Sequence, residues 1–158
     1  MCCHLPRQES PNHSAMKKIL LIGAVGSGKT TFVQAMMKAS LKYKKTQAME
    51  YYDTIIDTPG EYLESRRYNN ALIVASCDCH MVLLFQDASS KNCLFSPNFA
   101  SVFTKPVVGI VTKIDEEIKD IDYARDCLTL AGAEKIFEIS AIMGLGLEEL
   151  EDYMVLKP

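Results

Sequence analysis

The feature that most constrains this chain is the segment GAVGSGKT at residues 23–30, which follows an apolar run at residues 19–22. The segment fits the pattern G-x-x-x-x-G-K-[ST], whose structural context is a buried strand before it and a helix after it. Apolar residues then follow at helical spacing, as at Val33, Met36 and Met37. The sequence therefore predicts a strand, a phosphate-binding loop and a helix, in that order.

A loop of this kind binds phosphate because its glycines let successive backbone N–H groups converge on the anion at the start of a helix. We expect Lys29 to reach the β- and γ-phosphates of a nucleotide and the Thr30 hydroxyl to ligate Mg²⁺. The loop indicates a nucleoside triphosphate without saying which one. The nucleotide-binding residues expected here are Gly23, Val25, Gly26, Ser27, Gly28, Lys29, Thr30 and Thr31.

Short apolar runs alternate with helix-length amphipathic segments from Met16 onward, which is typical of an α/β domain. The chain has 158 residues, 48% of them hydrophobic and 23% charged, enough for a single domain with a full core. We expect a three-layer α/β domain over residues 16–158, with a mostly parallel sheet between helices, after a disordered polar arm over residues 1–15. Buried strands are predicted at residues 18–22, 54–57, 80–86, 106–111 and 136–139.

Charge and hydropathy exclude several classes of partner. The formal net charge is -3 without a long stripe of Lys or Arg, so binding to nucleic-acid backbone is not expected. The longest apolar runs, such as residues 81–85, are far shorter than the roughly 20 residues of a membrane-spanning helix, which argues against stable membrane insertion.

No signal peptide precedes the cysteines, so we expect reduced thiols in the cytoplasm. The C-x-C-H spacing of residues 77–80 differs from that of structural zinc sites, and no metal is expected there.

The segment DTPG at residues 57–60 closes the second predicted strand. A carboxylate at the end of a strand can hold Mg²⁺ through water, so Asp57 is a candidate metal residue. Gly60 can offer its backbone N–H to a γ-phosphate. Both residues join the expected nucleotide site.

The segment TKID at residues 112–115 closes the fourth predicted strand. The phosphate-binding loop, DTPG and TKID, in this order at the ends of strands, resemble the guanine-nucleotide-binding GTPases of the Ras-like and Era-like superfamily. The resemblance implies that Thr112, Lys113 and Asp115 read the base, because a carboxylate accepts from both N1–H and the 2-amino group of guanine. Adenine has an acceptor at N1 and no 2-amino group. Ser140-Ala141 is similar to the last motif of that superfamily, whose backbone N–H binds the guanine O6.

A narrower resemblance covers residues 16 to about 155. The stretches KTQAMEYY, IDTPGEYLESRRYNNAL and FSPNFASVFTKPVVGIVTKID resemble the EutP/PduV family of small GTPase-like proteins, encoded with ethanolamine- and propanediol-utilisation microcompartments. The resemblance implies a bacterial cytoplasmic protein associated with such a microcompartment. It also implies partners among the shell proteins or the enclosed enzymes.

Two residues, Glu61 and Val25, depart from the superfamily pattern, and the switch region is shorter than usual. Thr46 is the best candidate for the switch threonine that would close over Mg²⁺ and the γ-phosphate. Only residues 47–56 separate it from Asp57, so we expect a truncated switch-region hairpin. Glu61 stands where a glutamine often orients the attacking water, and Val25 stands where the fastest members keep glycine. These departures indicate slow turnover.

The function expected from this pattern is slow Mg²⁺-dependent hydrolysis of GTP to GDP. Two alternatives remain open: a kinase that transfers the γ-phosphoryl group to a small carboxylate such as acetate, and a nucleotide-gated targeting or scaffold module. The module would use the arm and the Arg66/Arg67 helix as its surfaces. The expected catalytic residues are Lys29, Thr46, Gly60 and Glu61, and the expected metal residues are Thr30, Thr46 and Asp57.

Overall fold

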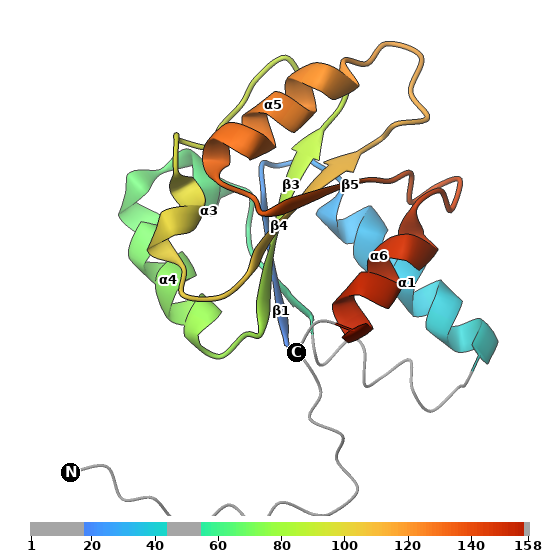
Figure 1. Cartoon of the computed structure of the whole chain (residues 1–158), viewed down its shortest axis with the longest axis horizontal. Helices are drawn as coiled ribbons and strands as arrows, with labels where there is room; N and C mark the ends of the chain where they lie inside the picture. The colour runs from blue at the N-terminus through green and yellow to red at the C-terminus, as the bar shows by residue number, and fades with distance from the viewer. Residues whose placement is uncertain (1–17, 44–54, 157–158) are drawn as a thin grey trace, which may run out of the picture.

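The structure, a computed structural model, describes residues 18–43 and 55–156 (Figure 1). Within them lies a five-stranded sheet with the order β2-β1-β3-β4-β5, and each neighbouring pair of strands is parallel. Each predicted strand is present, and its ends differ from the prediction by no more than one residue. The strands are β1 (Ile19–Gly23), β2 (Ile55–Asp57), β3 (Met81–Asp87), β4 (Val107–Thr112) and β5 (Lys135–Glu138).

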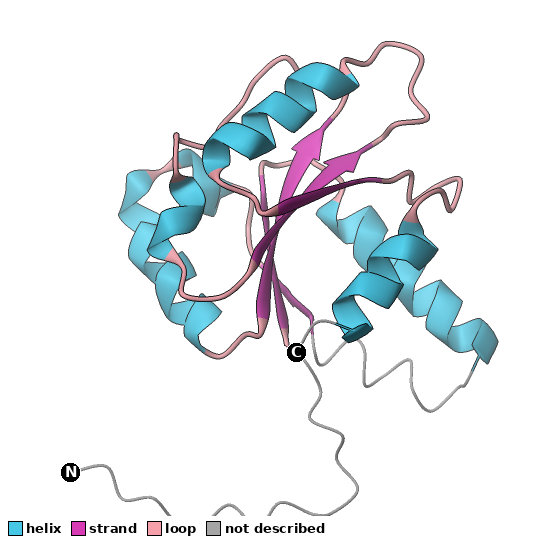
Figure 2. Ribbon diagram, viewed as in Figure 1, coloured by secondary structure: helices cyan, strands magenta, loops and turns pink. Residues whose placement is uncertain are grey.

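Helices cover both faces of this sheet, so the predicted three-layer α/β architecture is confirmed (Figure 2). On one face, α1 and α6 pack against Ile19 and Leu21 of β1. On the other, α4 and α5 pack with Leu20 and Ile22 of the same strand. The alternation follows from the two-residue period of a strand, which sends successive side chains to opposite faces. The helices are α1 (Lys29–Tyr43), α3 (Glu61–Glu64), α4 (Asn69–Cys77), α5 (Ile121–Ala131) and α6 (Leu147–Leu156).

Helix α5 shows how local sequence sets the ends of an element. The side chain of Asp120 accepts a hydrogen bond from the backbone N–H of Tyr123, which caps the first turn. The helix ends at Gly132, whose φ of 94° is the left-handed conformation that glycine adopts at low cost. The predicted helix stop at Gly132 is therefore present.

Parallel pairing brings the carboxyl ends of the strands to one edge of the sheet. Thr112 at the end of β4 is the register partner of Asp87 at the end of β3, and Phe85 of β3 pairs with Gly23 of β1. The strand order changes direction between β1 and β3, and such a switch point is where open α/β sheets bind ligands. The phosphate-binding loop begins at this point.

Some sequence predictions fall on residues outside the described part of the chain. These are the arm at residues 1–15, Thr46, and the truncated hairpin expected between Thr46 and Asp57. Arg66 and Arg67, expected on a helix, are exposed on a short 3-10 helix, η1 (Arg66–Tyr68). Among the described helices, each is too short or too polar to cross a bilayer.

Candidate nucleotide-binding site

The phosphate-binding loop leaves β1 at Gly23 and enters α1 at Lys29. Gly28 has a φ of 99°, and a Cβ added there would lie 3.3 Å from the side chain of Thr112. Glycine is thus needed both for the left-handed backbone and for the close approach of β4. The sequence pattern predicted a glycine here for another reason, the convergence of backbone N–H groups on phosphate, and the contact with Thr112 is visible only in the structure.

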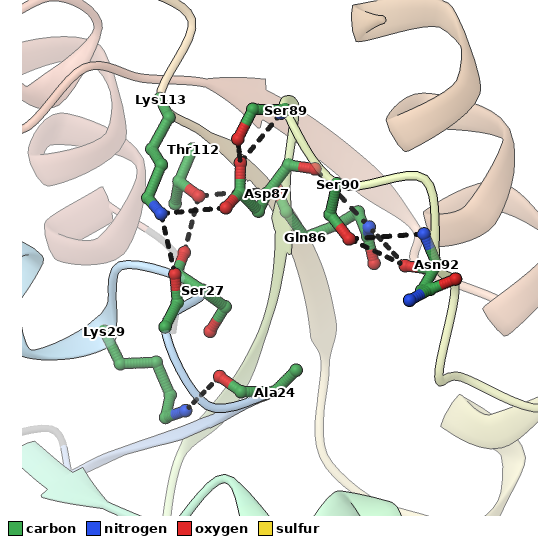
Figure 3. Close-up of polar contacts among 11 residues, drawn as sticks. Ala24, Ser27, Lys29, Gln86, Asp87, Ser89, Ser90, Asn92, Thr112 and Lys113 are labelled. Atoms are coloured by element: carbon green, nitrogen blue, oxygen red, sulfur yellow. Dashed lines mark hydrogen bonds and ion pairs between the residues drawn. The ribbon is translucent and has the colours of Figure 1, made fainter. Parts of the chain in front are cut away.

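Lys29 lies buried at the start of α1, with its side chain folded over the loop. Its ammonium donates a hydrogen bond to the carbonyl oxygen of Gly23 at 2.5 Å. It donates a second to the carbonyl oxygen of Ala24 at 3.1 Å (Figure 3). Burial lowers the pKa of Lys29, and the carboxylates of Asp57 and Glu61 partly offset this effect. A buried cation of this kind gains from an anion placed beside it, as a bound phosphate would be.

Asp57 ends β2 with its carboxylate near Lys29. Burial raises the pKa of Asp57, and the charge of Lys29 partly offsets the rise. Thr30 and Thr31 are exposed in the first turn of α1. A hydroxyl and a carboxylate are oxygen donors that suit Mg²⁺, which in nucleotide sites keeps several waters and takes phosphate oxygens as well. The described residues therefore fit the predicted metal at Thr30 and Asp57.

The segment after β2 lies directly against the phosphate-binding loop. The hydroxyl of Thr58 donates to the carbonyl oxygen of Leu21 at 2.7 Å, which ties this segment to β1. A Cβ added to Gly60 would lie 2.7 Å from the Cα of Val25, closer than any side chain can come. Glu61 follows, exposed, as the first residue of α3. Gly60 and Val25, both predicted site residues, are thus in contact, and the charge of Glu61 acts on Lys29.

The segment predicted to read the base, residues 112–115, is bonded to the phosphate-binding loop at two points (Figure 3). The hydroxyl of Thr112 donates to the carbonyl oxygen of Ser27 at 2.5 Å. The ammonium of Lys113 donates to the carbonyl oxygen of Gly26 at 2.8 Å. The segment predicted to read the base and the loop predicted to bind phosphate therefore form one connected surface.

Asp115 is oriented by the segment after β5. The hydroxyl of Ser140 donates to Oδ1 of Asp115 at 2.7 Å and accepts from the backbone N–H of Met143 at 3.2 Å. Ser140 is fully buried and Ala141 follows it at the site. The four predicted segments thus meet at one edge of the sheet, and of the predicted site residues only Thr46 lies outside the described ones.

One residue at this site was missed by the sequence reasoning. Asp87 forms an ion pair with Lys113, with 2.8 Å between Oδ2 and Nζ. The available signal was its position, since it is a carboxylate directly after the apolar run of residues 81–85. A carboxylate at the carboxyl end of a central strand lies at the ligand-binding edge of such a sheet.

A small cavity of about 60 Å³ lies beside the phosphate-binding loop. Its walls include Val25 and Ser27 of the loop, Leu63 of α3, and Phe85 and Phe95. The buried hydroxyl of Ser27 has no hydrogen-bond partner within the described residues. The residues that line the cavity include no lysine or arginine.

The fold is that of a P-loop NTPase domain of the GTPase type. This class is defined by the sheet order, by the phosphate-binding loop at the switch point of the sheet, and by the segments that converge on that loop. A family model described as "PduV-EutP: Ethanolamine utilisation - propanediol utilisation" matches residues 16–156. The chain belongs to this PduV-EutP family.

Individual relatives agree with the assignment to the PduV-EutP family and with the wider GTPase class. The "Propanediol utilization protein PduV" of Citrobacter freundii is 40% identical over 136 residues, which cover 85% of this chain and 91% of that protein. The "Probable acetate kinase EutP" of Salmonella typhimurium is 34% identical over 142 residues, covering 88% and 89%. More distantly, "GTPase Era" of Rhizobium meliloti is 25% identical over 166 residues, covering 86% of this chain and 50% of that protein.

Proposed function

We propose that residues 16–158 form a guanine-nucleotide-binding domain that hydrolyses GTP slowly with Mg²⁺. The observation that carries this proposal is the connection of the base-reading segment to the phosphate-binding loop. The side chains of Thr112 and Lys113 donate hydrogen bonds to successive carbonyls of the loop. The hydroxyl of Ser140 donates to the carboxylate of Asp115. A single nucleotide could therefore place its base on residues 112–115 and its phosphates on the loop.

Base selection would follow from the chemistry of Asp115. An ionised carboxylate only accepts hydrogen bonds, so it matches the N1–H and the 2-amino group of guanine and leaves adenine's N1 unpaired. The Ser140 bond to Oδ1 restricts the rotation of this carboxylate before the nucleotide arrives, which lowers the entropy lost on binding. The backbone N–H of Ala141 is the proposed donor to the guanine O6.

The phosphates would bind across the loop and the start of α1. Lys29 would supply the positive charge. Backbone or hydroxyl groups would come from Gly23, Val25, Gly26, Ser27, Gly28 and Thr31. Lys29 would exchange its bonds to loop carbonyls for bonds to phosphate oxygens. Thr30, and Asp57 through water, would hold Mg²⁺, which would neutralise charge that develops on the phosphates.

Hydrolysis requires a water molecule in line with the γ-phosphate. The backbone N–H of Gly60 and the side chain of Glu61 come from the segment that packs on Val25. Glu61 is a carboxylate beside an anionic phosphate, an unfavourable arrangement for charge, although it could accept a proton from the water. This arrangement supports slow turnover. The role of Thr46 in closing the site stays a prediction.

The cellular setting is proposed from the family. The family description gives ethanolamine and propanediol utilisation, and one relative is named for propanediol utilisation, so we infer a bacterial cytoplasmic protein that acts beside the corresponding microcompartments. The partners would be shell proteins or enclosed enzymes.

A second candidate is a kinase for a small carboxylate. It is favoured by the name of the EutP relatives, "Probable acetate kinase", and by the small cavity beside the loop. Ser27, whose buried hydroxyl has no hydrogen-bond partner among the described residues, is one of the residues that line this cavity. The cavity offers no cation among its lining residues, which an anionic acceptor would need, and we therefore place this activity second.

Parallel assays of phosphate release and acetyl phosphate formation, each with GTP and ATP in the presence of Mg²⁺ and acetate, separate the candidates. The proposal expects phosphate release with GTP and no acetyl phosphate. Acetyl phosphate formed faster than phosphate would replace it with the kinase. Nucleotide binding without either product would favour the targeting or scaffold module.

A further inference from the structure

Asp87 and the base-reading lysine lie side by side because of the register of two strands. Asp87 is the last residue of β3 and pairs with Thr112, the last residue of β4. Lys113 is the next residue, and its ammonium lies 2.8 Å from Oδ2 of Asp87 (Figure 3). The side chain of Asp87 is only 13% exposed, so this ion pair is shielded from solvent more than an ordinary surface pair.

The two carboxylate oxygens of Asp87 have different partners. Oδ1 accepts from the backbone N–H of Ser89 at 2.7 Å and from its hydroxyl at 2.6 Å. Oδ2 accepts from Lys113, which also donates to the carbonyl oxygen of Gly26. One oxygen therefore holds the turn after β3, while the other holds the base-reading segment.

Lys113 has a backbone conformation that needs such support. Its φ is 60°, in the left-handed region that residues other than glycine adopt uncommonly. Such a conformation persists where surrounding contacts over-determine it. Here the contacts are the bonds from the Lys113 ammonium to Asp87 and to Gly26.

Asp87 keeps its negative charge in this position. Burial alone would raise its pKa, but hydrogen bonds from Lys113 and Ser89 outweigh that effect and hold the pKa below the ordinary value. The carboxylate is therefore ionised at neutral pH. A charged acceptor makes a stronger bond to an ammonium than a neutral one.

We propose that Asp87 is a positioning residue for guanine recognition, which acts through Lys113 to fix the base-reading segment against the phosphate-binding loop. The inference rests on the proposed guanine site, because it assigns Asp87 a role in that site's selectivity. Without the ion pair, the ammonium of Lys113 would lose one of its two hydrogen-bond partners. Asp115, two residues further on, would then meet the base in a less defined orientation.

The test uses Asp87→Asn, which is nearly isosteric. The amide oxygen can still accept from Ser89, but the amide NH₂ then faces the Lys113 ammonium, donor against donor. We expect the dissociation constant of fluorescent GDP to rise about 10- to 100-fold, as for loss of a charge-assisted bond. The preference for GDP over inosine diphosphate, which lacks the 2-amino group, should fall toward one.

The matched control is Ser89→Ala, which removes the hydroxyl partner of Oδ1 and leaves Oδ2 with Lys113. We expect it to change GDP affinity by less than about threefold, the size of an ordinary surface substitution. The conservative variant Asp87→Glu keeps the charge and should recover part of the affinity and selectivity. It also serves as the readout if Asp87→Asn does not fold.

A double-mutant cycle asks whether Asp87 acts through Lys113. In a Lys113→Met background, which keeps the apolar stem and removes the charge, Asp87→Asn should alter GDP affinity by less than about twofold. An undiminished loss in that background would overturn the inference, as would unchanged affinity and selectivity in Asp87→Asn alone. If the parent protein does not bind GDP in preference to ADP, the proposed function itself is wrong, and the inference is overturned with it.

Discussion

The hydroxyl of Ser140 donates a hydrogen bond to Oδ1 of Asp115 across 2.7 Å, joining the segment after β5 to the segment after β4. The bond matters because a free aspartate can rotate about its side-chain torsions, and each ordered rotor costs entropy on binding. With Ser140 buried, this donor is itself held in place. The carboxylate proposed to read the base is therefore already oriented in the structure without a nucleotide.

Asp115→Asn should convert a guanine site into a xanthine site. The amide oxygen will take the place that accepts from Ser140, and the NH₂ group will face the base, where guanine has its own donors. GTP affinity should fall about 100-fold or more, since charge-assisted bonds contribute about 1.5–3 kcal/mol each. Xanthosine triphosphate has a carbonyl in place of the 2-amino group and should become preferred. Competition titrations with GTP, ATP and xanthosine triphosphate measure this, and equal binding of ATP and GTP by the parent would contradict the base assignment.

Ser140→Ala should weaken GDP binding without shifting the preference toward xanthine. The substitution leaves the Asp115 carboxylate intact and removes the donor that orients it, for an expected loss of about 5- to 10-fold. Titration with fluorescent GDP checks this, with Ser101→Ala of the 3-10 helix η2 (Phe99–Val102) as a control on an exposed serine. A loss as large as that of Asp115→Asn would mean that Ser140 touches the nucleotide itself.

Lys29→Ala should abolish triphosphate binding and leave the fold in place. The ammonium bonds to two loop carbonyls, and Lys29 is not one of the apolar residues of the core, so the sheet and helices should still form without it. Circular dichroism and a fluorescent-nucleotide titration measure the two effects, and Lys91→Ala, at an exposed position, is the matched control. Unchanged affinity in Lys29→Ala would refute the phosphate-loop assignment.

Glu61 variants should separate two roles for this carboxylate. Glu61→Gln removes the charge beside the γ-phosphate and should raise single-turnover GTP hydrolysis if that charge is only unfavourable. If the carboxylate accepts the proton of water, both Glu61→Gln and Glu61→Ala should lower it. Rapid-quench measurements of single turnovers compare the variants, and Glu64→Gln on the same helix is the control. If both Glu61 variants match the parent, the residue serves only to begin α3.

Cys127 should resist alkylation up to high pH. Burial, together with its contact with Cys93, raises the pKa of Cys127 from 9.0 to about 12. Because only the thiolate reacts, iodoacetamide at about pH 8.5 should label the exposed Cys77 far faster than Cys127 in the folded protein, as peptide mass spectrometry can measure. Unfolding in urea should remove the difference, and equal rates without urea would contradict the burial of Cys127.

The raised pKa of Cys127 also predicts how the free energy of unfolding changes with pH. The folded protein holds the Cys127 proton above pH 9.0, where the unfolded chain releases it. The contribution of this thiol to stability is therefore complete below that pH, and it is lost as the pH rises through about 12.

Much of the fold could be predicted because it depends on local patterns. Buried parallel strands are short, nearly continuous apolar runs, and the strand at Met81–Asp87 has this form, so its position is visible without a structure. The helix stop at Gly132 is equally local. Family membership, too, could be predicted from short stretches of sequence and is confirmed by the match over residues 16–156.

The sequence by itself determined which residues stand at the ends of the strands and which chemistry they offer, because motif spacing and hydrophobic period are properties of neighbours along the chain. Only the tertiary structure decided that Asp87 holds Lys113, that Ser140 holds Asp115 and that Gly60 packs on Val25. These contacts join residues far apart in sequence. They depend on the order β2-β1-β3-β4-β5, on the register that pairs Asp87 with Thr112, and on side-chain torsions set by the surrounding packing. A carboxylate such as Asp87 becomes part of a site when the sheet brings a cation to within hydrogen-bond distance of it, and no local pattern encodes that distance.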